Sequence, residues 1–243
     1  MRFYGLQKMT LLDFPGKVAC TLFTGGCNFR CPFCHNATLV TEWSRDDDSM
    51  SEDEVLAFLS KRTGLLDGVC FTGGEPLMHA ELLDVMRRVR EMGFAVKLDT
   101  NGSFPDRLQA VLDGHLADYV AVDLKNRKEK LRETIALPDF DIGKFERTIG
   151  ILKESDVPYE FRTTVVREFH TVEDIAAAAQ WIAGAPRYYL QAFVDSGALI
   201  GSDLHGADKA TMQAMRDAAA PFVGEVAIRG MLEKNTKYCV LPP

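Results

Sequence analysis

Three of the six cysteines lie close together, in the string CNFRCPFC that runs from Cys27 through Cys31 to Cys34. The string follows an apolar run at 18–23 and a turn at 24–26 that holds two glycines. Three thiolates on one loop can ligate three corners of a four-iron cluster, which takes four ligands, so that one iron stays open. An open iron is a Lewis-acidic docking position, and glycines let the backbone approach a ligand closely. The spacing therefore predicts an iron–sulfur cluster with a free coordination position.

Three other uses of this loop stay open. His35 could complete a four-ligand zinc site with the cysteines, although its position directly after Cys34 would require both neighbouring side chains to turn inward. The CxxCH string that begins at Cys31 also fits covalent haem attachment, and the CxxC pair alone fits a thiol–disulfide oxidoreductase. Neither of these two sites needs a third thiol, so Cys27 favours the cluster.

Composition excludes several classes of protein. The chain has 243 residues, with 28 Lys and Arg against 35 Asp and Glu, for a net charge of −7. This balance disfavours a general nucleic-acid binder. The sequence has no apolar run long enough to span a membrane, and its first ten residues do not resemble a secretion signal. We therefore expect a cytoplasmic protein with reduced thiols that binds neither nucleic acid nor membranes.

Short apolar runs alternate with amphipathic stretches along the chain. We expect strands at 18–23, 68–71, 95–99, 119–124, 159–166, 188–193 and 226–228, and helices after Ser51 and at 81–92, 105–112, 142–153, 171–182 and 209–218. This alternation is typical of a parallel sheet with crossover helices. With no clear linker, we expect one domain over 1–243, with the cluster loop at 24–36, an acidic surface loop at 45–49 and a loop or mobile flap at 125–138.

Ligands of parallel sheets and barrels bind at the carboxyl ends of the strands. Polar motifs lie at three of these ends. Gly73, Gly74 and Glu75 follow the second strand, Asp99 ends the third and Asp123 ends the fourth. Two carboxylates on neighbouring strand ends would favour a positively charged partner. Each motif also has a simpler interpretation, as a Gly-Gly turn or as an Asp that caps a turn.

The loop motif, C-x3-C-x-aromatic-C with Phe33 as the aromatic residue, resembles the signature of radical S-adenosylmethionine (SAM) enzymes. Three further motifs, GGE ending at Glu75, DTNG starting at Asp99 and DLK ending at Lys125, are similar to those of glycyl-radical-enzyme activating enzymes. The string GLQKMTLLDFPGK from Gly5 most resembles the activating protein of anaerobic ribonucleoside-triphosphate reductase. This resemblance implies a partial (β/α)6 barrel, one [4Fe–4S] cluster and SAM as cosubstrate.

The resemblance also implies a role for each motif residue. Cys27, Cys31 and Cys34 would ligate the cluster, and Gly73, Gly74, Glu75, Lys125 and Arg162 would contact SAM. Phe33 would pack beside adenine, Asp99, Thr100 and Asp123 would hold a monovalent cation, and Asp13 would contact the partner's glycyl loop. Simpler roles stay open: Phe33 as core, Lys125 as a solvated lysine, Arg162 in a structural salt bridge and Asp13 in a turn.

The implied partner is a glycyl radical enzyme, most closely the large subunit of anaerobic ribonucleoside-triphosphate reductase, with flavodoxin or a ferredoxin as electron donor. Pyruvate formate-lyase activating enzymes place a SAM-binding histidine near the end of the sixth strand, and this chain has none in the string from Gln191 to Asp195 that ends that strand. That difference favours the reductase. A radical SAM enzyme for a purine-like small molecule stays open. We expect Cys20 and Cys70 as buried apolar residues, Cys239 as a free surface thiol, and His79, His115, His170 and His205 at the surface or in loops.

Overall fold

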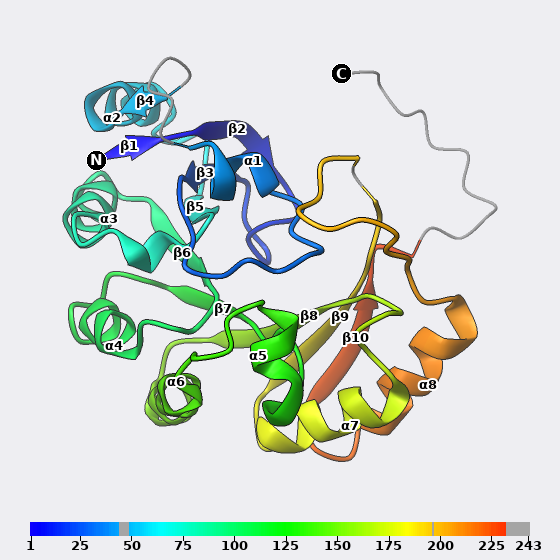
Figure 1. Cartoon of the computed structure of the whole chain (residues 1–243). Coiled ribbons are helices and arrows are strands. Elements are labelled where there is room, and N and C mark those ends of the chain that lie inside the picture. Colours follow the sequence, from blue (N-terminus) through cyan, green and yellow to red (C-terminus); the bar gives the residue numbers. More distant parts are fainter. Residues whose placement is uncertain (44–48, 196, 232–243) are drawn as a thin grey trace.

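The computed structural model describes residues 1–43, 49–195 and 197–231. Its centre is an eight-stranded sheet with the order β10-β9-β8-β7-β6-β5-β3-β2. Figure 1 shows the strands arranged in an arc, with most of the helices along its outer side. The structure is therefore of the α/β class, as the sequence predicts.

All seven predicted strands are confirmed, and they pair with one another in parallel. They are β3 (Ala19–Thr24), β5 (Gly68–Gly73), β6 (Ala95–Thr100), β7 (Tyr119–Asp123), β8 (Tyr159–Val165), β9 (Arg187–Ala192) and β10 (Glu225–Arg229). Three strands were not predicted: β2 (Gly5–Thr10), which lies antiparallel to β3, and the short pair β1 (Arg2–Phe3) and β4 (Met50–Ser51).

The six predicted helices are also confirmed. They are α2 (Glu52–Ser60), α3 (Leu82–Glu91), α4 (Pro105–Asp113), α6 (Ile142–Glu154), α7 (Val172–Trp181) and α8 (Lys209–Ala219). Capping boxes at Ser51 and Thr171 start α2 and α7, because each side chain accepts the backbone N–H three residues on. Two short helices, α1 (Ala37–Thr41) and α5 (Leu131–Thr134), and the 3-10 turns η2 (Pro76–Met78) and η3 (Lys128–Lys130) were not predicted.

The two faces of the sheet differ in chemistry. Alternate strand residues such as Leu22, Phe71 and Val122 are fully buried in the core shared with the helices. The residues between them point to the inner side of the arc, and many of those are charged. Lys97 and Asp99 lie two positions apart on β6 and so share the inner face. The fold therefore gathers charge on the concave side, towards the carboxyl ends of the strands.

The polar stretch 125–138 differs from the predicted loop, because it contains η3 and α5. Leu131 and Ile135 are buried, and the side-chain amide of the buried Asn126 donates to Thr134 Oγ1 at 2.9 Å. The buried residues recur at helical spacing within a run of charged ones, which hid the helix from a reading of the sequence. Residues 45–48 of the predicted acidic loop, and Cys239, lie outside the described residues.

His170 lies in the loop before α7, within the predicted description of a surface or loop residue, but it is buried. It is only 3% exposed, and its Nε2 lies 2.8 Å from the carbonyl oxygen of Lys125. Its Nδ1 accepts the backbone N–H of Val166 at 3.0 Å. Burial lowers the pKa of His170, so the neutral imidazole is favoured. The histidine thus ties the end of β8 to the segment after β7.

Among the described residues, no helix is long and apolar enough to cross a membrane.

Candidate active site

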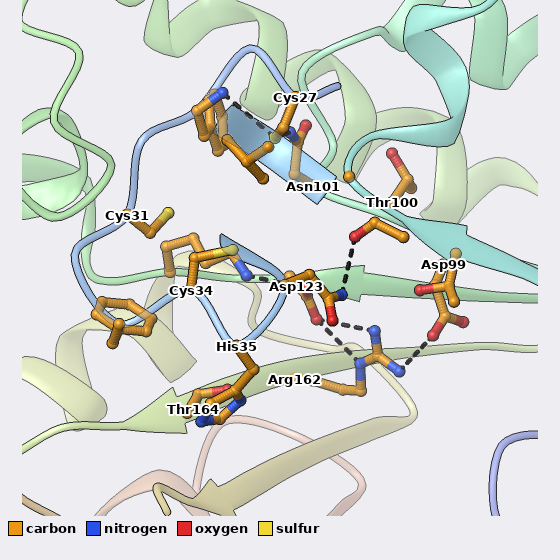
Figure 2. A pocket seen from close by; sticks show the side chains of 18 of the residues that line it. Cys27, Cys31, Cys34, His35, Asp99, Thr100, Asn101, Asp123, Arg162 and Thr164 are labelled. Carbon is orange, nitrogen blue, oxygen red and sulfur yellow. Dashed lines mark hydrogen bonds and ion pairs between the residues drawn. The ribbon is translucent and has the colours of Figure 1, made fainter. Parts of the chain in front are cut away.

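A pocket of about 220 Å³ lies at the carboxyl ends of the parallel strands. Most of the predicted site residues line it: Cys27, Cys31, Phe33, Cys34, Gly73, Gly74, Asp99, Thr100, Asp123, Lys125 and Arg162. Figure 2 shows the three cysteines spaced along one loop, with Asp99, Asp123 and Arg162 on neighbouring strands. Residues that are far apart in sequence thus share one wall, because parallel strands end at the same edge.

The cysteine loop is held by its own backbone and by the DTNG turn. The N–H of Cys34 donates to the carbonyl oxygen of Cys31 at 3.1 Å, and the N–H of Phe29 donates to Cys27 Sγ at 3.3 Å. Asn101 Nδ2 donates to the same sulfur at 3.7 Å and to Asn28 Oδ1 at 2.9 Å. N–H groups aimed at Cys27 Sγ favour its thiolate form, which is the form that binds metals.

Burial has the opposite effect on the free thiols. It raises the pKa of Cys27 to about 11 and that of Cys31 to about 12, and the nearby Lys125 ammonium only partly offsets it. Free thiols at these positions are therefore protonated at neutral pH. Metal binding reverses this preference, because a coordinated thiol is deprotonated outright. The pocket thus offers three thiols that a metal centre would convert to thiolates.

The geometry fits a cluster better than a single zinc ion. Zinc requires its ligands to converge on one point about 2.3 Å from each sulfur, whereas a cluster binds each thiolate to a separate iron. Across residues 1–43, 49–195 and 197–231, no three His, Cys, Asp or Glu side chains converge in this way. His35, the fourth ligand of the zinc alternative, is engaged elsewhere: its Nε2 lies 2.8 Å from Val194 O and its ring stacks on Phe193.

Arg162 joins the two strand-end carboxylates. Its Nη1 lies 2.8 Å from Asp99 Oδ2 and its Nη2 lies 2.9 Å from Asp123 Oδ1, while Lys125 Nζ lies 3.0 Å from Asp123 Oδ2. Burial alone would raise the pKa of Asp123, but Arg162 and Lys125 outweigh burial and lower it. Asp123 is therefore ionised, and its charge in turn raises the pKa of Lys125 and of Arg162 against the effect of burial.

Glu75 does not line the pocket. Its carboxylate is fully buried and accepts three hydrogen bonds, from Leu77 N at 3.0 Å, Thr100 Oγ1 at 2.7 Å and Asn101 N at 2.6 Å. Burial raises its pKa to about 7, against these hydrogen bonds. The structure therefore gives Glu75 the role of tying the GGE turn to the DTNG turn, so that any effect on a ligand passes through Thr100 and Asn101.

The GGE glycines allow two loops to touch. A Cβ on Gly74 would lie 1.8 Å from the carbonyl oxygen of Gly26, and Gly73 has a φ of +119°. The backbone N–H of Glu75 donates to the same oxygen of Gly26 at 2.8 Å. The close approach thus joins the turn after β5 to the start of the cysteine loop, and glycine is required there because the backbones meet.

Phe33 and Asp13 take positions compatible with both of their proposed roles. Phe33 is 3% exposed, packs against Phe169 with ring centroids 5.6 Å apart, and also lines the pocket. Asp13 lies outside the pocket wall, and its Oδ2 accepts a hydrogen bond from Thr21 Oγ1 at 2.6 Å. The segment that holds Asp13 also places the buried Phe14 against Cys70 and Tyr119 on the inner face.

Several pocket residues were given no site role from the sequence: Asn36, Thr72, Asn101, Thr164 and Gln191. Asn36 Nδ2 donates to the carbonyl oxygen of Gly73 at 3.0 Å, a second tie between the cysteine loop and the GGE turn. Asn36 could have been found because it lies two residues after Cys34, and Asn101 because it belongs to the DTNG motif. Gln191 lines the pocket from β9, at the strand end where the sequence shows no histidine.

A sequence profile of the radical SAM superfamily matches residues 21–182, which covers the cysteine loop and every strand end described above up to β8. The chain belongs to the radical SAM superfamily. It is therefore an enzyme of this group, and the family implies a [4Fe–4S] cluster and SAM. The three pocket cysteines fit that cluster by donor type and by their separate positions.

Curated relatives of this radical SAM enzyme include activating enzymes and 7-carboxy-7-deazaguanine synthases. A protein of Methanocaldococcus jannaschii, provisionally named a glycyl-radical enzyme activating enzyme, is 31% identical over 196 residues, 78% of each chain. The pyruvate formate-lyase-activating enzyme of Clostridium pasteurianum is 30% identical over 51% of this chain and 52% of its own. A 7-carboxy-7-deazaguanine synthase of Thermococcus kodakarensis is 30% identical over 65% of this chain and 66% of its own.

Solved structures confirm the fold. QueE from Escherichia coli superposes with a TM-score of 0.56 at 18% identity, over 95% of this chain and 94% of QueE. Streptococcus suis SuiB bound to its precursor peptide SuiA gives a TM-score of 0.65 at 14% identity. This chain spans about half the length of SuiB, matching 48% of it. At these identities the likeness concerns the fold alone.

Proposed function

We propose that this enzyme activates a glycyl radical enzyme. It cleaves SAM reductively and removes a hydrogen atom from the Cα of one glycine in the partner. The observation behind this proposal is the 31% identity to the Methanocaldococcus relative over 78% of both chains, in a protein whose pocket brings the cysteine, GGE, DTNG and DLK motifs together.

A [4Fe–4S] cluster held by Cys27, Cys31 and Cys34 would supply the single electron for reductive cleavage of the sulfur–C5′ bond of SAM into methionine and a 5′-deoxyadenosyl radical. That radical takes a hydrogen atom from the glycine, which leaves 5′-deoxyadenosine and a glycyl radical. The side chains of the pocket would bind and orient SAM. Lys125 and Arg162 are cations in the pocket wall that suit the SAM carboxylate, and Phe33 offers an apolar ring to the adenine.

The electrostatics of the pocket support this assignment. In the pocket wall, the positive charges of Lys125 and Arg162 balance the negative charges of Asp99 and Asp123, and the buried Lys97 adds one positive charge behind Asp99. These five side chains together have one positive charge in excess, which would favour the anionic carboxylate of SAM. Charge of both signs is therefore fixed before the cosubstrate binds.

For the partner we propose the large subunit of anaerobic ribonucleoside-triphosphate reductase, with flavodoxin or a ferredoxin as the electron donor. The N-terminal string from Gly5 supports this choice, and so does Gln191 in place of a histidine at the end of β9. Asp13 Oδ2 is bonded to Thr21, so its second carboxylate oxygen is the one that would accept a hydrogen bond from the partner's loop.

A second candidate is a radical SAM enzyme that acts on a purine-like small molecule. The observation in its favour is the relative named as a 7-carboxy-7-deazaguanine synthase, which is 30% identical over 179 residues. The activase is favoured because its relative covers a larger share of both chains.

One experiment distinguishes the two candidates. The cluster-reconstituted enzyme is incubated without oxygen with SAM, reduced flavodoxin and the reductase large subunit, and the products are followed by EPR and chromatography. We expect a glycyl radical on the partner and one 5′-deoxyadenosine per radical, with deuterium in the nucleoside when the partner contains α-deuterated glycine. The variant Cys31→Ala is the matched control. Nucleoside formation that requires a purine-like small molecule, with no radical on the partner, would contradict the activase.

A further inference from the structure

Each carboxylate oxygen of Asp99 and Asp123 already contacts a cationic side chain. Asp99 Oδ1 pairs with Lys97 Nζ, and Asp99 Oδ2 pairs with Arg162 at 2.8 Å. Asp123 Oδ1 pairs with Arg162 at 2.9 Å, and Asp123 Oδ2 pairs with Lys125 at 3.0 Å. The three cations and two anions alternate in the order Lys97, Asp99, Arg162, Asp123 and Lys125. Figure 2 shows Arg162 between Asp99 and Asp123, joined to both by dashed lines.

Lys97 is the least exposed member of this row. Its side chain is 2% exposed, and it lies one inner-face position deeper in the arc than Asp99. In register beside it are Cys70 on β5 and Tyr119 on β7, neither of which offers a carboxylate. A buried ammonium is strongly destabilising unless it is paired, so the pairing with Asp99 is what makes Lys97 tolerable there.

The resemblance to activating enzymes implies a monovalent cation held by Asp99, Thr100 and Asp123, and this structure does not fit one. Every oxygen of the two carboxylates already has a side-chain cation as its partner, so their negative charge is already compensated. Thr100 Oγ1 donates to Glu75 Oε1 at 2.7 Å and accepts the N–H of Gly102 at 3.2 Å, so it is also engaged.

We propose that the ammonium of Lys97 takes the place of the dissociable cation, so that SAM binding by this enzyme is independent of Na⁺ and K⁺. Lys97 is then a positioning residue: it fixes Asp99, and through Asp99 the Arg162 guanidinium that faces the cosubstrate. A tethered ammonium provides the same single charge as an alkali ion, without the loss of translational freedom that binding a free ion entails. The inference rests on the proposed function in so far as the pocket binds SAM.

The wild-type enzyme gives the first test. SAM affinity of the cluster-reconstituted protein is measured by calorimetry in tetramethylammonium chloride, NaCl and KCl at one ionic strength, so that screening is equal. We expect the three dissociation constants to agree within about twofold, since no cation is exchanged. A dissociation constant that falls about tenfold or more when Na⁺ or K⁺ is added would overturn the inference.

The variant Lys97→Met gives the second test, because it frees Asp99 Oδ1. In tetramethylammonium chloride its SAM dissociation constant should rise about tenfold or more, and adding Na⁺ or K⁺ should restore most of the lost affinity. Lys128→Met is the matched control: it removes a half-exposed lysine that pairs with Glu146 at the surface, and should leave SAM binding unchanged in every salt. Iron content and circular dichroism confirm that each variant is loaded and folded.

The remaining outcomes of these two tests separate the inference about Lys97 from the proposed function. Wild-type affinity of Lys97→Met in tetramethylammonium would overturn the inference while leaving the proposed function intact. Absence of SAM binding by the loaded wild-type enzyme in all three salts would contradict the proposed function, and the inference would fall with it. If Lys97→Met does not fold, the wild-type salt series decides alone.

Discussion

Arg162 and Asp123 are paired in register on adjacent strands, and the guanidinium Nη2 lies 2.9 Å from the carboxylate Oδ1, with Nε at 3.0 Å from the same oxygen. The same guanidinium reaches Asp99 on the next strand at 2.8 Å. One side chain thus fixes the ends of β6, β7 and β8 in relation to one another. The planar fork of arginine suits this task, since its donors point in fixed directions.

Replacing this fork should destabilise the fold. Arg162→Met leaves two mostly buried carboxylates short of a partner, so the free energy of unfolding should fall by about 3–5 kcal/mol. Arg162→Lys keeps the charge but loses the bridge, and should lose about 1–3 kcal/mol. Urea unfolding of the reduced, metal-free protein measures both. Arg147→Met, which removes an exposed pair with Asp106, is the control and should change stability by less than about 1 kcal/mol. Wild-type stability of Arg162→Met would show that the bridge has no structural role.

Replacing a cysteine should abolish iron binding when the cysteine lies in the loop and leave iron binding unchanged when it lies in the core. Cys31→Ala should abolish cluster assembly and leave a folded chain, because a cluster with two protein ligands lacks the third attachment. Cys70→Ala removes a thiol that is fully buried on β5 and outside the pocket, and should keep full iron content. Iron and sulfide analysis with visible absorption decides. A wild-type iron content in Cys31→Ala would reject the ligand assignment.

The contact between Gly74 and Gly26 predicts a strong effect of one methyl group. Gly74→Ala would place a Cβ 1.8 Å from the carbonyl oxygen of Gly26, so the two loops must separate. Overpacking of this kind typically lowers stability by about 1–3 kcal/mol, and here it should also lower iron incorporation. Gly150→Ala, in the open middle of α6, meets no atom within 4 Å and should raise stability by about 0.5–1 kcal/mol. Equal effects of the two changes would contradict the close approach.

Glu75 predicts a pH dependence with a definite sign. Burial raises its pKa from 4.5 to about 7, so the folded protein binds a proton that the unfolded chain has already released between these values. Stability from this group is therefore complete below pH 4.5 and falls as the pH rises towards 7. Glu75→Gln lacks this titration. The unfolding free energy of Glu75→Gln relative to wild type should therefore rise from pH 5 to pH 8 in paired urea titrations, and a constant or falling difference would contradict the raised pKa.

Much of this architecture could be predicted, because strand ends leave a clear pattern in the sequence. Apolar runs that stop at a polar motif, such as the run before Asp99 or before Asp123, identify both the strand and the edge where it ends. Capping boxes at Ser51 and Thr171 gave two helix starts in the same direct way. Motif residues from four strands therefore converged in one pocket as expected.

The features that the sequence did not predict depend on where a side chain points and on which elements pack around it. The strand Gly5–Thr10 alternates weakly, and all of its residues except Thr10 are exposed or half-exposed, so it has no apolar signature. The orientation of Glu75, away from the pocket and towards Thr100 and Asn101, is decided by the turn after β5, which no periodicity reveals. Lys97 could have been found, because a charged residue two positions before Asp99 in a strand must share its face. The burial of His170 could not be predicted, because its loop position in the sequence does not show which elements pack around it.

Low-temperature EPR of the anaerobically reconstituted and reduced protein, recorded with and without SAM, tests whether the three cysteines hold a cluster that binds SAM. We expect a reduced four-iron signal whose g-values shift when SAM is added, because SAM binds the iron that the three cysteines leave open. A protein that contains zinc in place of iron, or an iron signal that SAM leaves unchanged, would contradict it.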